Sequence, residues 1–123
     1  MPSPTDTTDL SALRELIRHF VDERDWAQFH TPKNLAMAMS IEAAEVMEHF
    51  QWLPTGHELA DDKRVAVGHE LADVLVYLVR LADVLDIDLP AAVAEKMALN
   101  RLKYPADRVR GDARKYDEYP DRE

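Results

Sequence analysis

Two long segments of this chain, 33–51 and 62–86, carry apolar side chains at helical spacing on more than one face. At about 100° per residue, the first segment has one apolar stripe and further apolar residues elsewhere: Met39, Ala43, Val46 and Phe50 in the stripe, and Met37, Ile41 and Met47 outside it. The second segment repeats this pattern: Val67, Leu71, Val74, Leu78, Leu81 and Leu85 form a stripe, and Val65, Val76 and Val79 lie outside it. A helix that is apolar nearly all round has to be buried on several sides. Because 123 residues provide one domain with a single core, we expect a homodimer or a homotetramer to cover these faces.

Two further helices complete the expected fold. The first is predicted by four apolar residues at helical spacing, Leu10, Leu13, Ile17 and Phe20. An aromatic and polar loop, 23–32, follows it and ends at Pro32, which disfavours helix in the residue before it. Asp88 can cap a last helix that continues to about Lys103. No segment shows strand-like alternation, so the predicted fold class is an all-α, four-helix bundle.

The predicted helices form one domain between two flanking segments. Residues 1–9 are rich in Pro, Ser, Thr and Asp and indicate a flexible tail, residues 10–105 form the helical domain, and the charged residues 106–123 form a C-terminal arm. Within the domain, Thr55 and Glu58 have capping-box spacing. We therefore expect a new helical start at this point, before the long third helix.

Charge and composition exclude several classes of function. The net charge is −9, and no basic helix stands out, so a polynucleotide partner is disfavoured. A small anionic substrate is still compatible, because a bound divalent cation can invert the local field. The chain has no cysteine, which excludes disulfides and thiolate metal sites. It has no signal peptide or long apolar run, so we expect no membrane partner and residence in the cytoplasm.

Two pairs of acidic residues interrupt the apolar pattern of the two long segments. Glu42 and Glu45 are three residues apart and therefore share one helix face. Glu70 and Asp73 repeat this spacing in the second segment. If the two helices pack side by side, four carboxylates converge. Such a group repels itself unless some members are protonated or a divalent cation lies among them.

The ligand type indicates which cation would fit. Oxygen-only ligation favours Mg²⁺, Mn²⁺ or Ca²⁺ over zinc, and Mg²⁺ usually keeps open positions for water and substrate phosphates. A di-iron bundle is disfavoured, because it needs Glu-x-x-His ligands and none of the five histidines follows a Glu at that spacing. Four carboxylates around such a cation therefore suit the hydrolysis of a phosphate ester. The ordinary alternative is that each acidic pair lies on a solvated helix face.

Aromatic and basic residues surround the acidic pairs in the expected fold. His49 and Trp52 continue the face of the first pair, and Tyr77 and Arg80 continue the face of the second. Three aromatic residues of this region suit stacking on a nucleobase, although such residues are more often core anchors: Trp26, Phe29 and Trp52. On the last helix, three residues share a face that is either solvated or able to grip phosphates: Lys96, Asn100 and Lys103.

Taken together, these motifs resemble those of a known family. The marks are Glu23 to His30 with Pro32 and Asn34, Glu42-x-x-Glu45, Phe50-Gln51-Trp52, Glu70 to Leu78, Asp88-Leu89-Pro90, and Lys96 to Tyr104-Pro105. Over about residues 10 to 116 the chain resembles the all-α nucleotide pyrophosphohydrolases of the MazG type, and most closely their dCTP pyrophosphatase branch. The resemblance makes residues 10–105 a MazG-like catalytic domain.

The resemblance implies an activity and a set of roles. The reaction would convert a nucleoside triphosphate, dCTP or a related or modified dNTP, to its monophosphate and pyrophosphate, in nucleotide pool cleansing. Mg²⁺, with Mn²⁺ as a substitute, would be held by four carboxylates, those of Glu42, Glu45, Glu70 and Asp73, and Glu45 would be the general base. Four residues would line the base pocket: Trp26, His30, Trp52 and Tyr77. Lys96, Asn100 and Tyr104 would bind the sugar and phosphates.

The chain departs from the family pattern at two positions, and two other functions stay open. The family usually has Gly where this chain has Ala44, and an apolar residue where it has His49, so the preference for cytosine is not decided. One alternative is a non-catalytic helical protein that binds nucleotide or serves assembly. The other is a phosphohydrolase that releases only inorganic phosphate.

Overall fold

The computed structural model describes residues 4–119, and this part of the chain is helical without strands. The elements are α1 (Leu10–Glu23), η1 (Ala27–Phe29), α2 (Pro32–Glu48), α3 (Asp61–Val84), α4 (Leu89–Lys103), α5 (Ala106–Val109) and η2 (Tyr116–Glu118). The predicted all-α class is confirmed. Each of the four predicted long helices is present, and the second ends three residues earlier than expected.

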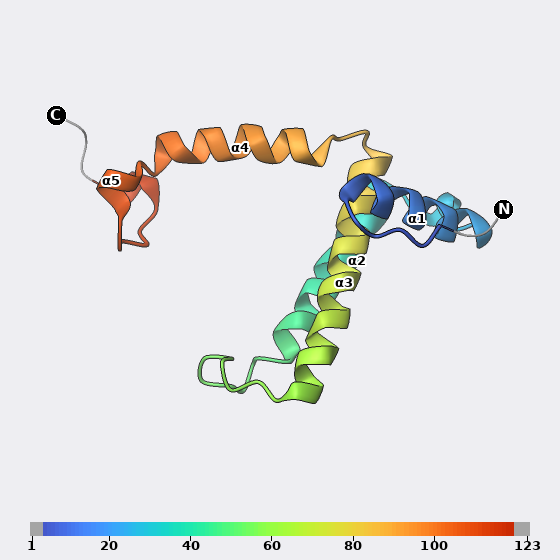
Figure 1. The fold of residues 1–123 in the computed structure, drawn as a ribbon, viewed down its shortest axis with the longest axis horizontal. Coiled ribbons are helices and arrows are strands. Elements are labelled where there is room, and N and C mark those ends of the chain that lie inside the picture. Colours follow the sequence, from blue (N-terminus) through green and yellow to red (C-terminus); the bar gives the residue numbers. More distant parts are fainter. Residues whose placement is uncertain (1–3, 120–123) are drawn as a thin grey trace. The chain divides into compact units, whose positions relative to one another are not determined.

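The two long helices α2 and α3 form an antiparallel hairpin, and α1 packs against α3 (Figure 1). The buried apolar residues of the described chain all belong to these three helices: Ile17, Val21, Leu35, Val67, Val79 and Ala82. Glu42 and Glu45 therefore lie on α2, and Glu70 and Asp73 lie on α3, the helix that packs against it. The side-by-side packing on which the convergence of the acidic pairs depends is therefore present.

Three of the four long helices, α1, α2 and α4, begin where a side chain replaces a missing backbone partner. The Asp9 carboxylate accepts from the Ala12 amide at 2.8 Å at the start of α1, and the Thr31 hydroxyl accepts from the Asn34 amide at the start of α2. The Asp88 carboxylate accepts from the Ala91 amide at 3.0 Å, as the sequence predicts for α4. Such caps stabilise a helix by about 1 kcal/mol each.

Helices α1 and α3 end in the same backbone motif. Asp25 (φ 53°) and Asp86 (φ 56°) adopt the left-handed conformation just after the last turn. The following amides then reach back, from Trp26 to the Val21 carbonyl at 3.1 Å and from Ile87 to the Ala82 carbonyl at 2.8 Å. This is the Schellman arrangement, in which Asp takes the place usually occupied by Gly. The first motif directs the chain so that Trp26 turns back toward α1.

The expected helical start at Thr55 is wrong, although the Glu58 carboxylate makes its part of the capping-box contacts. The Glu58 carboxylate accepts from the Thr55 amide at 3.2 Å and from the Thr55 hydroxyl at 2.8 Å. Gly56, however, has a φ of 93°, which a right-handed helix cannot accommodate. The capping contacts therefore stabilise a tight loop, and α3 starts later, at Asp61.

The chain divides into two compact units, residues 1–87 and 88–123. The second unit contains α4, α5 and η2. The predicted tail 1–9 and arm 106–123 extend past the described residues at positions 1–3 and 120–123. The boundaries predicted at 9/10 and 105/106 stay predictions. Among residues 4–119, no helix combines the length and apolarity that crossing a bilayer requires.

Candidate metal and nucleotide site

The carboxylates of Glu42 and Glu45 on α2 and of Glu70 on α3 converge in the helix hairpin. One oxygen from each of these three residues lies within 4.8 Å of the other two. All three side chains are half-buried. Three of the four predicted ligands are thus brought together. The hairpin achieves this although Glu45 and Glu70 are 25 positions apart in the sequence.

The electrostatics of this cluster are unfavourable without a cation. Burial, then the hydrogen bond and charge of Glu45, and then the charges of Asp73 and Glu70 raise the pKa of Glu42 to about 7. The pKa of Glu70 is also raised, first by its contact with Glu45. Among the described residues, the Glu42 Oε2 and Glu70 Oε2 atoms are buried without a hydrogen-bond partner. Unpaired buried oxygens of this kind are costly, and a cation would satisfy them.

The donor set therefore fits a hard divalent cation. Carboxylate oxygens are the ligands that Mg²⁺ and Mn²⁺ prefer, and three of them within one cluster leave room for water and phosphate oxygens. His49 lies at the edge of the cluster, with its Nε2 3.7 Å from the Glu70 Oε1. This contact lowers the pKa of Glu70 and partly opposes the effect of Glu45.

Asp73, the fourth predicted ligand, lies outside this three-residue cluster but close enough for its charge to raise the pKa of Glu42. It also lines a cavity of about 430 Å³ between α1, the loop after it and α3. Asp73 thus connects the carboxylate cluster with this cavity.

The cavity has a largely apolar and aromatic wall with a few polar groups. It is lined by Leu16, Ile17, Phe20, Val21, Trp26, His30, Asp73, Val76, Tyr77 and Arg80. Three of the four residues predicted for a base pocket, Trp26, His30 and Tyr77, are among them. Trp26 is held there by the turn after α1 and by an edge-to-face contact with Phe20, whose ring centroid is 5.8 Å away. A concave apolar site with convergent polar groups is typical of small-molecule binding.

Trp52 does not line this cavity, and the other three predicted residues belong to the second unit. Trp52 is 87% exposed in the loop between α2 and α3. Lys96, Asn100 and Tyr104 belong to the second unit, where the Tyr104 hydroxyl accepts from the Tyr116 amide at 3.2 Å. The roles assigned to these four residues stay predictions.

Arg80 is a cavity residue for which the sequence predicts a helix face but no role in the site. It lies one turn beyond Tyr77 on α3, and its Nε donates to the His30 Nδ1 at 3.1 Å. The spacing from Tyr77 placed Arg80 on the correct helix face. The partner His30 is 50 residues away in sequence, however, and no local pattern indicates that contact.

Comparison with known proteins identifies a family and several relatives. The model of the MazG-like family matches residues 37–119. The chain is 45% identical to dCTP pyrophosphatase 1 of Homo sapiens over 123 residues, which cover 97% of this chain and 70% of the relative. It is 44% identical to dCTP pyrophosphatase 1 of Rattus norvegicus with the same coverage.

A solved structure agrees with these sequence matches. The crystal structure of a pyrophosphatase from Archaeoglobus fulgidus aligns with a TM-score of 0.75 at 41% identity, covering 82% of this chain and 96% of that chain. The region that matches the family model contains the whole carboxylate cluster and Asp73. Trp26 and His30 precede it and fall within the longer match to the human relative, which spans almost the entire chain.

Proposed function

Because this chain belongs to the MazG-like family, as its motifs predicted, we propose that it is a nucleoside triphosphate pyrophosphohydrolase. Its substrate would be dCTP or a related dNTP, since the similar curated proteins are named dCTP pyrophosphatase 1. The observation that carries the proposal is the carboxylate cluster of α2 and α3, which Asp73 connects with an aromatic-lined cavity. This arrangement suits a metal-bound triphosphate whose base enters the cavity.

Mg²⁺ is the proposed cofactor, with Mn²⁺ as a substitute. Glu42, Glu45, Glu70 and Asp73 would hold it, which is supported by the unpaired buried oxygens of Glu42 and Glu70. When bound, the cation supplies positive charge to the phosphate oxygens and favours ionisation of a water molecule.

The residues of the chain then perform three tasks. Glu45 accepts a proton from the water that attacks the α-phosphorus, while the bond from this phosphorus to the bridging oxygen breaks and pyrophosphate leaves. Trp26, His30 and Tyr77 bind the base in the cavity. Trp52, which does not line the cavity, keeps its predicted role as a further contact to the base. Lys96, Asn100 and Tyr104 are proposed to bind the sugar and phosphates.

We also propose that the working form is a homo-oligomer, a dimer or a tetramer. Support comes from α2 and α3, which leave large apolar side chains exposed: Met37, Ile41, Met47, Val65 and Leu71. A second copy of the chain is the occupant that the two-faced apolar pattern requires. Nucleotide pool cleansing in the cytoplasm is the proposed setting.

The activity is tested by incubating the protein with each dNTP and Mg²⁺ and separating the products by anion-exchange chromatography. We expect monophosphate and pyrophosphate, and we expect Glu45→Gln to lower kcat by about 10²–10⁴-fold, the usual contribution of a general base. Gln keeps the size of the side chain, so thermal unfolding should show an intact fold.

Two results would contradict the proposal. Formation of the diphosphate and inorganic phosphate would indicate a phosphohydrolase of the other kind. Absence of turnover for every triphosphate, with Glu45→Gln indistinguishable from wild type, would leave a non-catalytic nucleotide-binding or assembly protein.

A further inference from the structure

Arg80 is a nearly buried cation in the wall of the candidate base pocket. Only 11% of its side chain is exposed. Its guanidinium makes two contacts at that position: Nε donates to the His30 Nδ1 at 3.1 Å, and Nη1 lies 3.5 Å from the Asp83 Oδ2. A buried guanidinium needs such partners, because its desolvation is costly.

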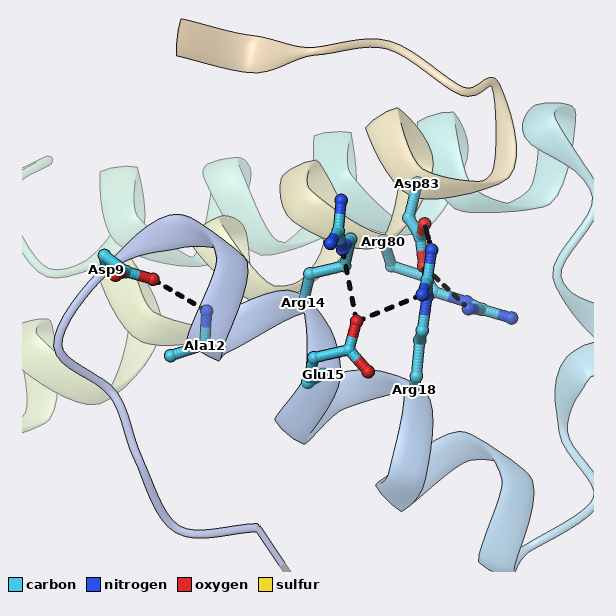
Figure 2. A network of polar contacts seen from close by, with 7 residues as sticks. All are labelled: Asp9, Ala12, Arg14, Glu15, Arg18, Arg80 and Asp83. Atoms are coloured by element: carbon cyan, nitrogen blue, oxygen red, sulfur yellow. Dashed lines mark hydrogen bonds and ion pairs between the residues drawn. The ribbon is translucent and has the colours of Figure 1, made fainter.

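The orientation of Arg80 depends on a carboxylate that is itself held in place. Figure 2 shows Arg18 of α1 and Arg80 of α3 converging on Asp83. The Arg18 Nε donates to the Asp83 Oδ2 at 2.7 Å, and the Arg18 Nη2 donates to the other carboxylate oxygen. Only 9% of the Asp83 side chain is exposed. Two-point contacts of this kind fix direction as well as distance, so Asp83 is a rigid anchor for Arg80.

The contact with Arg80 determines where His30 carries its proton. A guanidinium has donors only, so the Nδ1 of His30 must be the unprotonated acceptor. Burial and then the nearby positive charge of Arg80 lower the pKa of His30, which favours the neutral ring. A neutral imidazole with a free Nδ1 lone pair has its one proton on Nε2. Within residues 4–119, this Nε2 has no protein partner.

We propose that Arg80 is a positioning residue that holds His30 in the Nε2–H tautomer, so that His30 presents a hydrogen-bond donor to an acceptor atom on the edge of the nucleobase. The proposal rests on the proposed function, because it assigns the base to the cavity that His30 and Arg80 line. Arg18 and Asp83 complete the chain of contacts, Arg18–Asp83–Arg80–His30. This series of contacts connects the base pocket to the packing of α1 on α3.

The tautomer of His30 affects which nucleobase is bound and does not affect the hydrolysis step. A base that offers a carbonyl oxygen or ring nitrogen to Nε2–H is bound, and a base that offers an N–H there leaves two donors facing each other. A site built to hydrogen-bond one group discriminates strongly against an analogue without it. Loss of Arg80 should therefore weaken binding of the preferred dNTP and reduce the discrimination between bases.

Nuclear magnetic resonance tests the tautomer without any turnover. In a long-range ¹H–¹⁵N correlation spectrum of the wild-type protein at pH 8, we expect His30 to show a protonated Nε2 and an unprotonated Nδ1. In Arg80→Met, which removes the donor but keeps an unbranched side chain, the two nitrogen signals should move toward each other as the tautomers exchange. A wild-type ring protonated at Nδ1 overturns the proposal, as does a spectrum that Arg80→Met leaves unchanged.

Steady-state kinetics test the consequence for the substrate. With dCTP and Mg²⁺, we expect Arg80→Met to raise KM about fivefold, the usual effect of one lost hydrogen bond, with kcat within twofold of wild type. Arg80→Lys retains a donor and should restore both KM and the Nε2–H signal. An unchanged KM in Arg80→Met, or a loss confined to kcat, would contradict a positioning role.

The two experiments, the NMR spectra and the kinetics, distinguish failure of this inference from failure of the proposed function. A wild-type protein that hydrolyses no dNTP overturns the proposed function, whereas the spectra still decide the tautomer. If Arg80→Met does not fold, Arg80→Lys decides the question, because its ammonium has donors only and should preserve the wild-type spectrum. A changed tautomer in folded Arg80→Lys would then overturn the inference.

Discussion

At the scale of single residues, Asp83 shows how one buried carboxylate connects two helices. The hydrogen bonds from Arg18 keep the pKa of Asp83 below its usual range. The folded state therefore binds fewer protons at this carboxyl than the unfolded state does in the region below about pH 4. By linkage, the stabilisation is present above the unfolded pKa and is lost as the pH falls through the folded one.

Asp83→Asn should destabilise the protein at pH 7 by about 1–2 kcal/mol, a value at the low end for a charged hydrogen bond because Arg18 is 44% exposed. The difference from wild type should shrink as the pH falls below about 4. Urea unfolding from pH 3 to pH 7 measures it. Glu15→Gln is the control, since its 55% exposed carboxylate should contribute less than about 0.5 kcal/mol. A difference that stays constant down to pH 3 would contradict this reading.

At this scale the sequence predicts charge spacing well and long-range partners poorly. The i, i+3 spacing placed Glu42 with Glu45, and the cluster adds Glu70 from the neighbouring helix. The contact of Arg80 with His30 depends on the path of the loop after α1, which side-chain spacing does not specify. Asp73 shows the same limit, because helical spacing does not decide how much it faces the cluster or the cavity.

At the scale of elements, the turn after α1 decides where Trp26 lies. Asp25 has a φ of 53°, a conformation that costs a β-branched residue about 1–2 kcal/mol and costs Gly very little. Asp25→Val should therefore lower the free energy of unfolding by about this amount and change the fluorescence of Trp26. Asp25→Gly is the matched control and should retain both. Equal stability of the Val and Gly variants, measured by urea unfolding, would show that the turn is not strained.

The sequence also predicts the helix starts better than the loops between them. The start of α4 is predictable because Asp88 can cap a helix, and the start of α2 is predictable because Pro32 disfavours helix in the residue before it. The predicted capping box at Thr55 forms only the contact from the Thr55 amide to the Glu58 carboxylate and begins no helix, because the backbone of Gly56 turns the chain away. Which apolar stripe is buried within the chain was also not predictable: Val79, outside the expected stripe, is 4% exposed, whereas Leu71, inside it, is 53% exposed.

At the scale of the whole molecule, both units leave apolar side chains uncovered. In α2, Met37 is 56% exposed and Met47 is 70% exposed, and in α4, Leu102 is 79% exposed. No residue of α4 is buried. The two-faced apolar pattern predicted such surfaces, because it depends only on composition and period. How the copies are arranged depends on the complementarity between their surfaces, and the spacing of apolar residues in the sequence does not describe it.

A charge placed on this apolar surface should separate the copies. In a symmetric interface each substitution acts twice, and burial of one Met side chain is worth about 1.5–3 kcal/mol. Met37→Glu should therefore raise the dissociation constant by about 10²–10⁴-fold. Light scattering after gel filtration should give a multiple of the 14.1 kDa chain mass for wild type and a single chain mass for Met37→Glu. Lys63→Glu, an exposed site where the charge changes by more, should leave the assembly intact. A wild-type protein that runs as one chain at micromolar concentration, with full activity, would show that the exposed apolar face of α2 has another role.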